Sequence, residues 1–167
     1  MNRKAQGALE FLTTYGWAFL VILIMIGAMM YFGILNPDKF LPERCTTNTG
    51  FSCEEHQISV DNSNLYVKFI IKNVLPDTIK LENSMNLKSE IFTGGNITLA
   101  CTVDDSTIYQ NQDTGVSCDV PKSNLVGSVF PQVGSKVKIV VDTKYKPVGK
   151  TLNKTLSTEI FGMVQNS

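Results

Sequence analysis

The sequence contains few of the residues from which enzyme active sites are commonly built. It has one histidine, His56, which stands beside Glu54 and Glu55. Because neighbouring residues of a strand point to opposite faces, this cluster predicts a solvated loop rather than a metal site. No serine lies in a nucleophile-elbow motif, and no glycine-rich phosphate loop precedes a helical pattern. The sequence therefore predicts neither an enzyme nor a bound cofactor.

An excess of one charge is also absent. The chain has 15 Lys and Arg residues against 15 Asp and Glu residues, which gives a formal net charge of +0. A nucleic-acid surface needs a concentrated basic patch, and nothing in the sequence suggests one. We therefore expect no nucleic acid among the partners of this protein.

Charge is missing altogether from residue 11 to residue 35, a run of 25 residues. The core of this run, residues 17–35, has 19 residues. As a helix with a rise of about 1.5 Å per residue it is about 28 Å long, close to the ~30 Å hydrocarbon thickness of a bilayer. Only a helix can cross lipid here, since every backbone N–H and C=O must find its partner within the segment. The run predicts one membrane-spanning helix.

The basic residues around this run set the expected topology. Arg3 and Lys4 are the only basic residues that precede it. By the positive-inside rule, we expect the N-terminus in the cytoplasm and the larger C-terminal part outside. Residues 45–167 are enough for one modest domain.

All the cysteines, Cys45, Cys53, Cys101 and Cys118, follow the predicted span. Outside the cytosol an even number of cysteines is expected to pair, and four cysteines permit three pairings. We expect the local pairs Cys45–Cys53 and Cys101–Cys118, because each closes a short polar loop. The alternative is a metal site, but neither spacing is a CxxC and the sequence has a single histidine.

The residues before the span have the features of a processed leader. No small-x-small cleavage site follows the apolar run, as it would after an ordinary secretory signal. The cleavage point that fits the sequence lies between Ala5 and Gln6, before the apolar run. Cleavage there would keep the apolar helix on the mature chain.

Glu10 is the acid at the start of the apolar run, and two interpretations of it stand. At the membrane interface a carboxylate costs little, whereas at the bilayer centre it costs about 3 kcal/mol. Glu10 either marks the membrane surface, where the helix macrodipole also favours an acid, or pairs with a neighbouring subunit. In the second case it neutralises the N-terminal ammonium, at Gln6 after cleavage, when helices pack away from lipid.

Arg3, Lys4 and Ala5 before Gln6, with Glu10 as the fifth residue of the mature chain, resemble the processing region of archaeal type IV pilin-like proteins. More narrowly, residues 6–10 resemble the group with class III signal peptides, whose mature chains begin with glutamine and follow a Gln-x-Ser-x-Glu pattern. Position 8 is alanine where that pattern has serine, and position 14 is threonine where it usually ends in leucine. The resemblance covers about the first 40 residues. It implies that a prepilin peptidase cuts the leader and that identical subunits assemble through their N-terminal helices, with Gln6 and Glu10 at the contact.

From residue 45 onward, short runs rich in β-branched and aromatic residues alternate with turn residues. Lysine alternates with valine and isoleucine after residue 135, which predicts a strand with one solvated face. Seven or eight such strands, separated by turns, predict an antiparallel β-sandwich head in an α+β chain. The expected strands are 58–60, 65–72, 78–82, 90–92, 97–103, 128–131, 135–145 and 156–164.

Several acids surround the loop between Cys101 and Cys118. The spacing of these acids does not match a calcium-binding loop, because no closing bidentate acid follows a spaced Asp/Asn series. We therefore expect a solvated polar loop and no metal site. The acids are Asp104, Asp105, Asp113 and Asp119.

Two Asn-x-Thr tripeptides lie in the expected head. They begin at Asn96 and Asn153. Each is a candidate glycosylation site and predicts a position that faces solvent.

The sequence thus predicts a cleaved leader (1–5), a hydrophobic transmembrane or filament-core helix (6–35), a linker (36–44) and an extracellular β-sandwich head (45–167). The first functional hypothesis is a structural subunit of an archaeal type IV pilus-like surface filament, used in adhesion or surface attachment. Its subunits would sit in the cell membrane before assembly and at the cell surface afterwards. The alternative is a single-pass membrane-anchored extracellular β-domain that acts as a minor pilin or a binding module.

Overall fold

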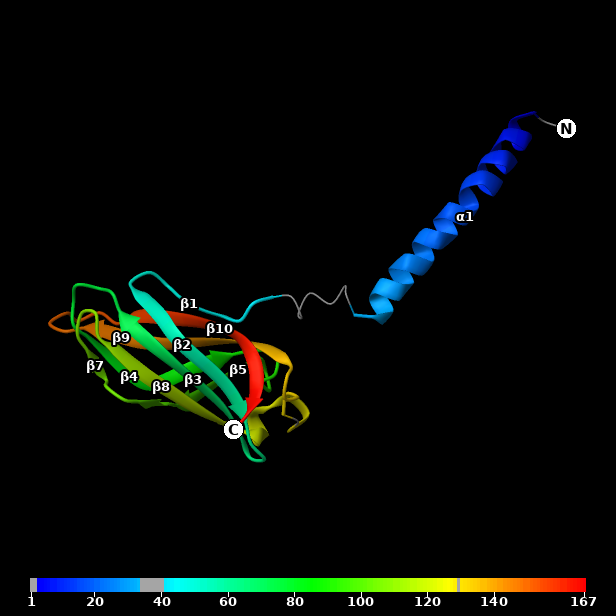
Figure 1. Ribbon diagram of the computed structural model, residues 1–167. Coiled ribbons are helices and arrows are strands. Elements are labelled where there is room, and N and C mark those ends of the chain that lie inside the picture. The colour runs from blue at the N-terminus through cyan, green and yellow to red at the C-terminus, as the bar shows by residue number, and fades with distance from the viewer. Residues whose placement is uncertain (1–2, 34–40, 129) are drawn as a thin grey trace. The chain divides into compact units, whose positions relative to one another are not determined.

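The structure is a computed structural model that describes residues 3–33, 41–128 and 130–167. The chain divides into two compact units, Met1–Leu41 and Pro42–Ser167. The first contains helix α1 (Arg3–Tyr31), and the second, the head, contains the strands of the described residues (Figure 1). An N-terminal apolar helix followed by a sheet-rich domain agrees with the sequence prediction. Most of the predicted linker lies outside the described residues.

A glycine follows the C-terminal end of helix α1. Its last residue is Tyr31, and Gly33 follows with a φ of 66°. The Gly33 N–H donates to the Met30 carbonyl at 3.0 Å. Glycine often follows a helix in this left-handed conformation, because it lacks the Cβ that makes the conformation costly. The stop that the sequence predicts, at Asn36 and Pro37, lies outside the described residues.

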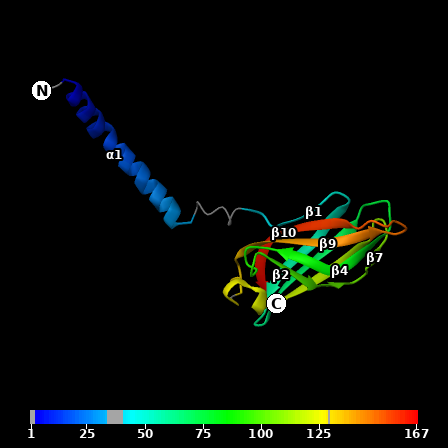
Figure 2. The same cartoon turned by 180° about the vertical axis from the view of Figure 1, so that it is seen from behind.

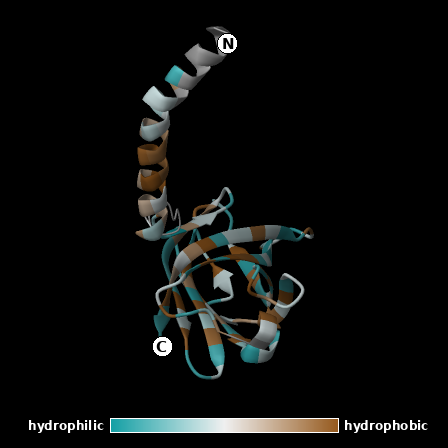
Figure 3. Cartoon of the chain, turned by 90° about the vertical axis from the view of Figure 1, so that its right-hand side faces the viewer, coloured by the Kyte–Doolittle hydropathy of each residue, from teal (hydrophilic) through white to brown (hydrophobic). Residues whose placement is uncertain are grey.

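From Tyr15 to Tyr31, apolar side chains occur around α1, and the large ones are exposed. Within the described residues, Thr13–Tyr31 is long enough and apolar enough to cross a bilayer. Membrane anchors and signal sequences both have this property. Trp17, Ile24 and Met30 are 68%, 62% and 64% exposed. The brown turns in Figure 3 mark this apolar stretch. Such a surface needs a cover of lipid or of protein.

The strands of the head form one continuous sheet of ten strands. Their order across the sheet is β5-β4-β9-β10-β2-β3-β8-β6, with β1 paired to β10 and β7 paired to β4. Two 3-10 helices, η2 (Lys122–Asn124) and η3 (Val126–Ser128), lie between β8 and β9. The strands are β1 (Arg44–Thr47), β2 (Phe51–Val60), β3 (Asn64–Asn73), β4 (Ile79–Lys88), β5 (Asn96–Ala100), β6 (Thr102–Val103), β7 (Thr107–Ile108), β8 (Asp113–Pro121), β9 (Lys136–Pro147) and β10 (Lys154–Asn166).

Strand β10 belongs to two halves of this sheet. Residues 154–163 pair antiparallel with β9, whereas Val164, Gln165 and Asn166 pair parallel with β2. We call β1, β4, β5, β7, β9 and residues 154–163 half-sheet one. Half-sheet two consists of β2, β3, β6, β8 and the last residues of β10. Figures 1 and 2 show the two halves facing each other around a common interior.

The sheet is nearly closed into a barrel. Its two end strands, β5 and β6, are consecutive in the chain and are separated only by Cys101. The predicted antiparallel β-sandwich is therefore not confirmed, since the head is a barrel-like sheet that includes one parallel pair of strands. Alternation along a strand predicts which side chains face the core, but it does not predict that one strand continues from one half-sheet into the other.

The interior of the head is apolar and comes from both half-sheets. Along β9 the inward residues Val137, Ile139 and Val141 are buried, while Lys138 and Lys144 between and beyond them are exposed. Burial of a side chain of this size contributes about 1.5–3 kcal/mol. The largest fully buried side chains are Phe92, Ile58, Leu65, Ile71, Ile79, Met85, Leu87, Ile108, Leu125, Ile139, Leu156 and Ile160.

Strand β8 is absent from the sequence prediction, which treats its residues as part of a polar loop. In the structure β8 pairs with both β3 and β6. Its inward residues Thr114, Val116 and Val120 are buried and alternate with outward polar positions. The period-two signal is therefore present, but aspartate and glycine at the outward positions give the segment the composition of a loop.

The strand predicted at 128–131 is wrong. Helix η3 occupies the start of this segment, and Gly127 within it has a φ of 65°. Phe130 and Pro131 have no regular structure, and position 129 lies outside the described residues. Glycine in the left-handed region turns the chain and interrupts the extended backbone that a strand requires.

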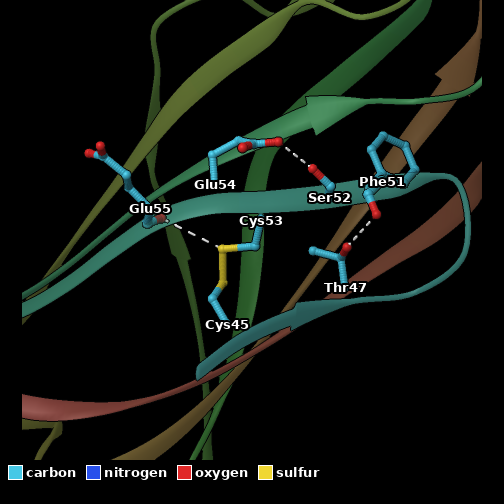
Figure 4. Close-up of a disulfide and its surroundings, with 7 residues drawn as sticks. All are labelled: Cys45, Thr47, Phe51, Ser52, Cys53, Glu54 and Glu55. Carbon is cyan, nitrogen blue, oxygen red and sulfur yellow. Dashed lines mark hydrogen bonds between the residues drawn. A yellow bond between two sulfur atoms is a disulfide. The ribbon is translucent and has the colours of Figure 1, made fainter. Parts of the chain in front are cut away.

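Each disulfide joins the two half-sheets. Cys45 in β1 bonds to Cys53 in β2, with Cα atoms 5.7 Å apart (Figure 4). Cys101, between β5 and β6, bonds to Cys118 in β8, with Cα atoms 4.5 Å apart. These are the pairs expected from the sequence, so the cysteines do not form the alternative metal site. One bond lies beside the β10 crossing and the other lies where the two end strands meet.

We expect loss of the Cys101–Cys118 disulfide to open the barrel at its end strands. Replacing both residues with alanine should lower the free energy of unfolding by about 3 kcal/mol, because the bond restricts the unfolded chain. Urea denaturation measures this change, and hydrogen exchange should rise in β5, β6 and β8. In the matched variant Cys45→Ala/Cys53→Ala, exchange should rise in β1 and β2 instead. The same exchange pattern in both variants would contradict the prediction that one disulfide holds β1 to β2 and the other holds the end strands together.

Candidate functional site

The first candidate site is the N-terminal part of α1. Lys4, Ala5 and Gln6, the predicted cleavage residues, have a helical backbone in its first turns. Glu10 is exposed and follows Gln6 by four residues, so the two positions lie on the same side of the helix. The structure thus places the predicted new N-terminus and the predicted acid one helical turn apart.

Two threonines follow Glu10 and are satisfied within the helix. The hydroxyls of Thr13 and Thr14 donate to the Glu10 carbonyl at 3.1 Å and 2.7 Å. A hydroxyl bonded to the preceding turn needs no partner outside its own helix, so these side chains can enter apolar surroundings. From residue 10 to residue 31, Glu10 carries the only charge. Its carboxylate is the group that needs a partner from outside the helix.

The surface beyond Glu10 is suited to burial on every side. An apolar stripe would indicate one partner groove, but here apolar side chains occur around the whole helix. Lipid or a bundle of similar helices can cover such a surface completely. The exposed large apolar residues of α1 are Phe11, Tyr15, Trp17, Phe19, Leu20, Val21, Ile22, Leu23, Ile24, Met25, Ile26, Met29, Met30 and Tyr31.

The second candidate site is a cavity of about 600 Å³ over the outward face of β2, β3 and β8. We call this cavity the acidic groove. Gly115 contributes to its floor, and a side chain at this position would overlap the Asp104 carboxylate. Asp119, further along β8, is not among the lining residues. The charged lining residues are Glu55, Lys68, Asp104, Asp105 and Asp113.

Glu55 and His56 point to opposite sides of β2. Both residues are among those that line the groove, but Glu55 pairs with Ile70 and faces outward, whereas His56 pairs with the buried Phe69 and its ring faces inward. The His56 ring packs against Gly162 of β10, where an added Cβ would lie 3.4 Å from the ring. The buried Nε2 of His56 has no hydrogen-bond partner among the described residues. The described part of the chain brings together no group of three His, Cys, Asp or Glu side chains that could hold a metal.

The outward face of half-sheet one carries ion pairs. Glu159 lies 2.8 Å from Arg44 and 2.9 Å from Lys138, and Asp142 lies 2.6 Å from Lys88. The Lys138 hydrogen bond, opposed by burial, lowers the pKa of Glu159. Burial raises the pKa of Asp142, but hydrogen bonds from Lys88 and a neighbouring serine outweigh it and the net shift is downward. No local pattern in the sequence predicts these pairs, because their members are distant in the chain.

The two glycosylation candidates are both exposed. Asn96 is the first residue of β5, and Asn153 directly precedes β10. The Asn153 side-chain amide donates to the Glu82 carboxylate at 3.1 Å. Their exposure is compatible with modification, and glycosylation of either residue stays a prediction.

No family model matches the chain, and no curated protein matches it. Among solved structures, one match is described as "X-ray structure of Northeast Structural Genomics Consortium target SoR45". It is 14% identical over 70% of this chain and 83% of that chain, with a TM-score of 0.37. A likeness this weak carries no argument about fold or function. The candidate sites therefore rest on the residues of this chain.

We expect Glu159→Gln to destabilise the head at neutral pH. The pKa of Glu159 is lowered from 4.5 in the folded state, so the carboxylate stabilises the fold above that ordinary value. This contribution is lost as the pH falls through the lower folded pKa. Urea denaturation should show a loss of at most about 1 kcal/mol at pH ~7, which disappears near pH ~2.

Glu90→Gln is the matched control for this measurement. Glu90 is exposed and, among the described residues, has no ion pair. It should unfold like the native protein at both pH values. A Glu159→Gln difference that persists at acid pH would show that packing, rather than the ion pairs, is responsible.

Proposed function

We propose that the chain is a structural subunit of an archaeal type IV pilus-like surface filament that serves adhesion or surface attachment. The observation that carries the proposal is α1, an apolar helix uncharged from residue 11 to residue 31. Gln6 and Glu10 precede that stretch in the arrangement of a prepilin processing region. A prepilin peptidase would cut between Ala5 and Gln6, and the mature chain would keep the whole apolar surface.

Before assembly, α1 crosses the cell membrane once, with the N-terminus in the cytoplasm and the head outside. Arg3 and Lys4 support this orientation because they are the basic residues that flank the span on its N-terminal side. The two disulfides of the head support it too, since such bonds persist outside the reducing cytosol. After assembly, the head lies at the cell surface as part of the filament.

Assembly exchanges lipid contacts for contacts between helices. The Glu10 carboxylate then leaves the membrane interface and enters an apolar bundle, where an unpaired charge is costly. An α-ammonium on Gln6 of a neighbouring subunit would satisfy it. Two unit charges 4 Å apart attract by about 4 kcal/mol at an effective dielectric constant of ~20. The pair would also select one axial register between neighbouring helices.

The head is suited to coat such a filament. Its hydrophobic core consists of residues between 51 and 164, so it does not need the apolar surface of α1 to fold. Both disulfides lie within the same unit. An independently folded head leaves the helix free to pass from lipid into a bundle.

The second candidate function is that of a single-pass membrane-anchored β-domain, acting as a minor pilin or a binding module. The acidic groove favours it, because binding modules commonly use a concave surface with a few polar groups. In that case the leader stays on the chain or the helix stays in lipid. Processing and polymerisation therefore separate the two functions.

The first measurement is the N-terminus of the protein from its native cells, by intact mass and terminal sequencing. We expect a mature chain that starts at Gln6 and lacks residues 1–5. A chain that still starts at Met1 or Asn2 would favour the membrane anchor. A chain that starts with pyroglutamate would support processing but remove the ammonium proposed to pair with Glu10.

The second measurement is filament assembly by Glu10→Gln. This substitution keeps the size of the side chain and removes its charge, so the leader should still be cut while filaments fall by about tenfold or more, as expected for loss of a buried charge pair. Electron microscopy and sedimentation of sheared filaments measure the yield. Glu10→Asp should restore part of it, because the charge is kept on a shorter side chain. Normal filament yield from Glu10→Gln would show that Glu10 only marks the membrane surface.

A further inference from the structure

Three lysines gather on the outward face of half-sheet one. Lys80 in β4 stands directly opposite Lys146 in β9, and Lys144 lies two residues earlier on the same side of β9. All three are exposed. We call Lys80, Lys144 and Lys146 the basic patch.

The acid of its own face that lies beside the basic patch is Glu82, two residues after Lys80, and its carboxylate accepts a hydrogen bond from the Asn153 amide. Three other cations on half-sheet one have carboxylates within 4 Å: Lys88 has Asp142, and Arg44 and Lys138 have Glu159. Among the described residues, the three lysines of the patch have no ion pair. Like charges directly opposite each other on neighbouring strands repel. A carboxylate from outside the chain would relieve that repulsion.

The acidic groove has the opposite excess. It is lined by four carboxylates and one lysine, and the carboxylates of Glu55, Asp104 and Asp105 have no ion pair among the described residues. The cross-strand neighbour of Asp113 is Lys72, which lies at the edge of this face. The strands of the groove belong to half-sheet two and those of the patch to half-sheet one.

We infer that the basic patch of one chain docks on the acidic groove of a second copy of this chain. Three ammonium groups meet a cavity lined by four carboxylates, and the charges of the whole chain balance at 15 against 15. A foreign partner with one dominant charge would complement only one of the two surfaces. A second copy complements both, which is why it is the occupant that the charges favour.

This contact joins two different surfaces, so it is heterologous. Each copy offers one patch and one groove, and repetition of such a contact gives a ring or an open row of heads. The inference rests on the proposed function for its setting, because a bundle of helices would hold neighbouring heads at high local concentration. In that setting each exposed ion pair contributes little alone, and several act together.

One candidate glycan bears on the contact. Thr155, the third residue of the Asn153 tripeptide, pairs with Lys144 across β9 and β10. A glycan on Asn153 would therefore stand beside the patch. The test uses full-length chain produced without glycosylation, both in detergent micelles and after detergent removal.

The test is carbodiimide cross-linking of mixed chains, half of them labelled with nitrogen-15. Carbodiimide joins a lysine and a carboxylate that are in contact, and mass spectrometry identifies the two peptides. Mixed heavy–light pairs can arise only between chains. This distinction is needed because Lys80 also lies towards the groove of its own chain, where the Leu81 N–H donates to the Ser106 carbonyl. We expect heavy–light links from Lys144 and Lys146 to Asp104 and Asp105. Links that are only intramolecular, or that join other surfaces, would overturn the inference.

Charge exchange sharpens the test. Lys146→Glu and Asp105→Lys should each lower the heavy–light yield by roughly fivefold, whereas the double variant, or a mixture of the two single variants, should recover it. Lys122→Glu, an exposed lysine on η2 outside both surfaces, is the matched control and should link like the native chain. Equal yields from all variants would overturn the inference.

The outcomes also separate this contact from the filament itself. If mature filaments form normally from Lys146→Glu and Asp105→Lys with unchanged cross-links, the contact is refuted and the proposed function stands. If the native chain keeps its leader and forms no filaments, the proposed function fails. Heavy–light links after detergent removal would then still support contact between heads. Links from the groove or the patch to a different protein in native membranes would overturn the inference that a second copy occupies them.

Discussion

The head depends on the backbone pairing of β10 with two neighbours in succession. Because β10 pairs with β9 along most of its length and with β2 at its end, the two half-sheets share one strand and cannot separate without breaking its hydrogen bonds. The disulfides link the two half-sheets covalently as well. Cys45–Cys53 lies beside the crossing, and Cys101–Cys118 lies where the short end strands meet.

This closure explains how the chain can carry a large uncovered apolar helix. The buried hydrophobic core of the head consists of residues between 51 and 164. The two units therefore have separate requirements: the head needs water on its outward faces, and the helix needs lipid or other helices. Glu10 lies at the boundary between these needs, since its charge is tolerated at an interface and requires a partner inside a bundle.

The outward faces of the head show how charge is arranged once the core is fixed. Strand β9 alternates valine and isoleucine inward with lysine outward, so the core and the charged face come from the same period of two. Neighbouring strands then decide which lysines have partners. Lys138 meets Glu159, whereas Lys146 meets Lys80, and this difference separates a neutralised surface from a basic one.

Features that depend on neighbouring residues could be predicted from the sequence: the uncharged helix, the alternation of β9 and, as the expected choice among three pairings, the local cysteine pairs. Its leader and assembly residues, Gln6 and Glu10, rest on a local motif and stay predictions. Tertiary structure alone decided the crossing of β10, the central place of β8 and the two charged surfaces. The reason is separation along the chain: Arg44 and Glu159 are 115 residues apart, and Lys88 and Asp142 are 54 apart. Local periodicity sets which way a side chain faces, but only strand order and register set what it faces.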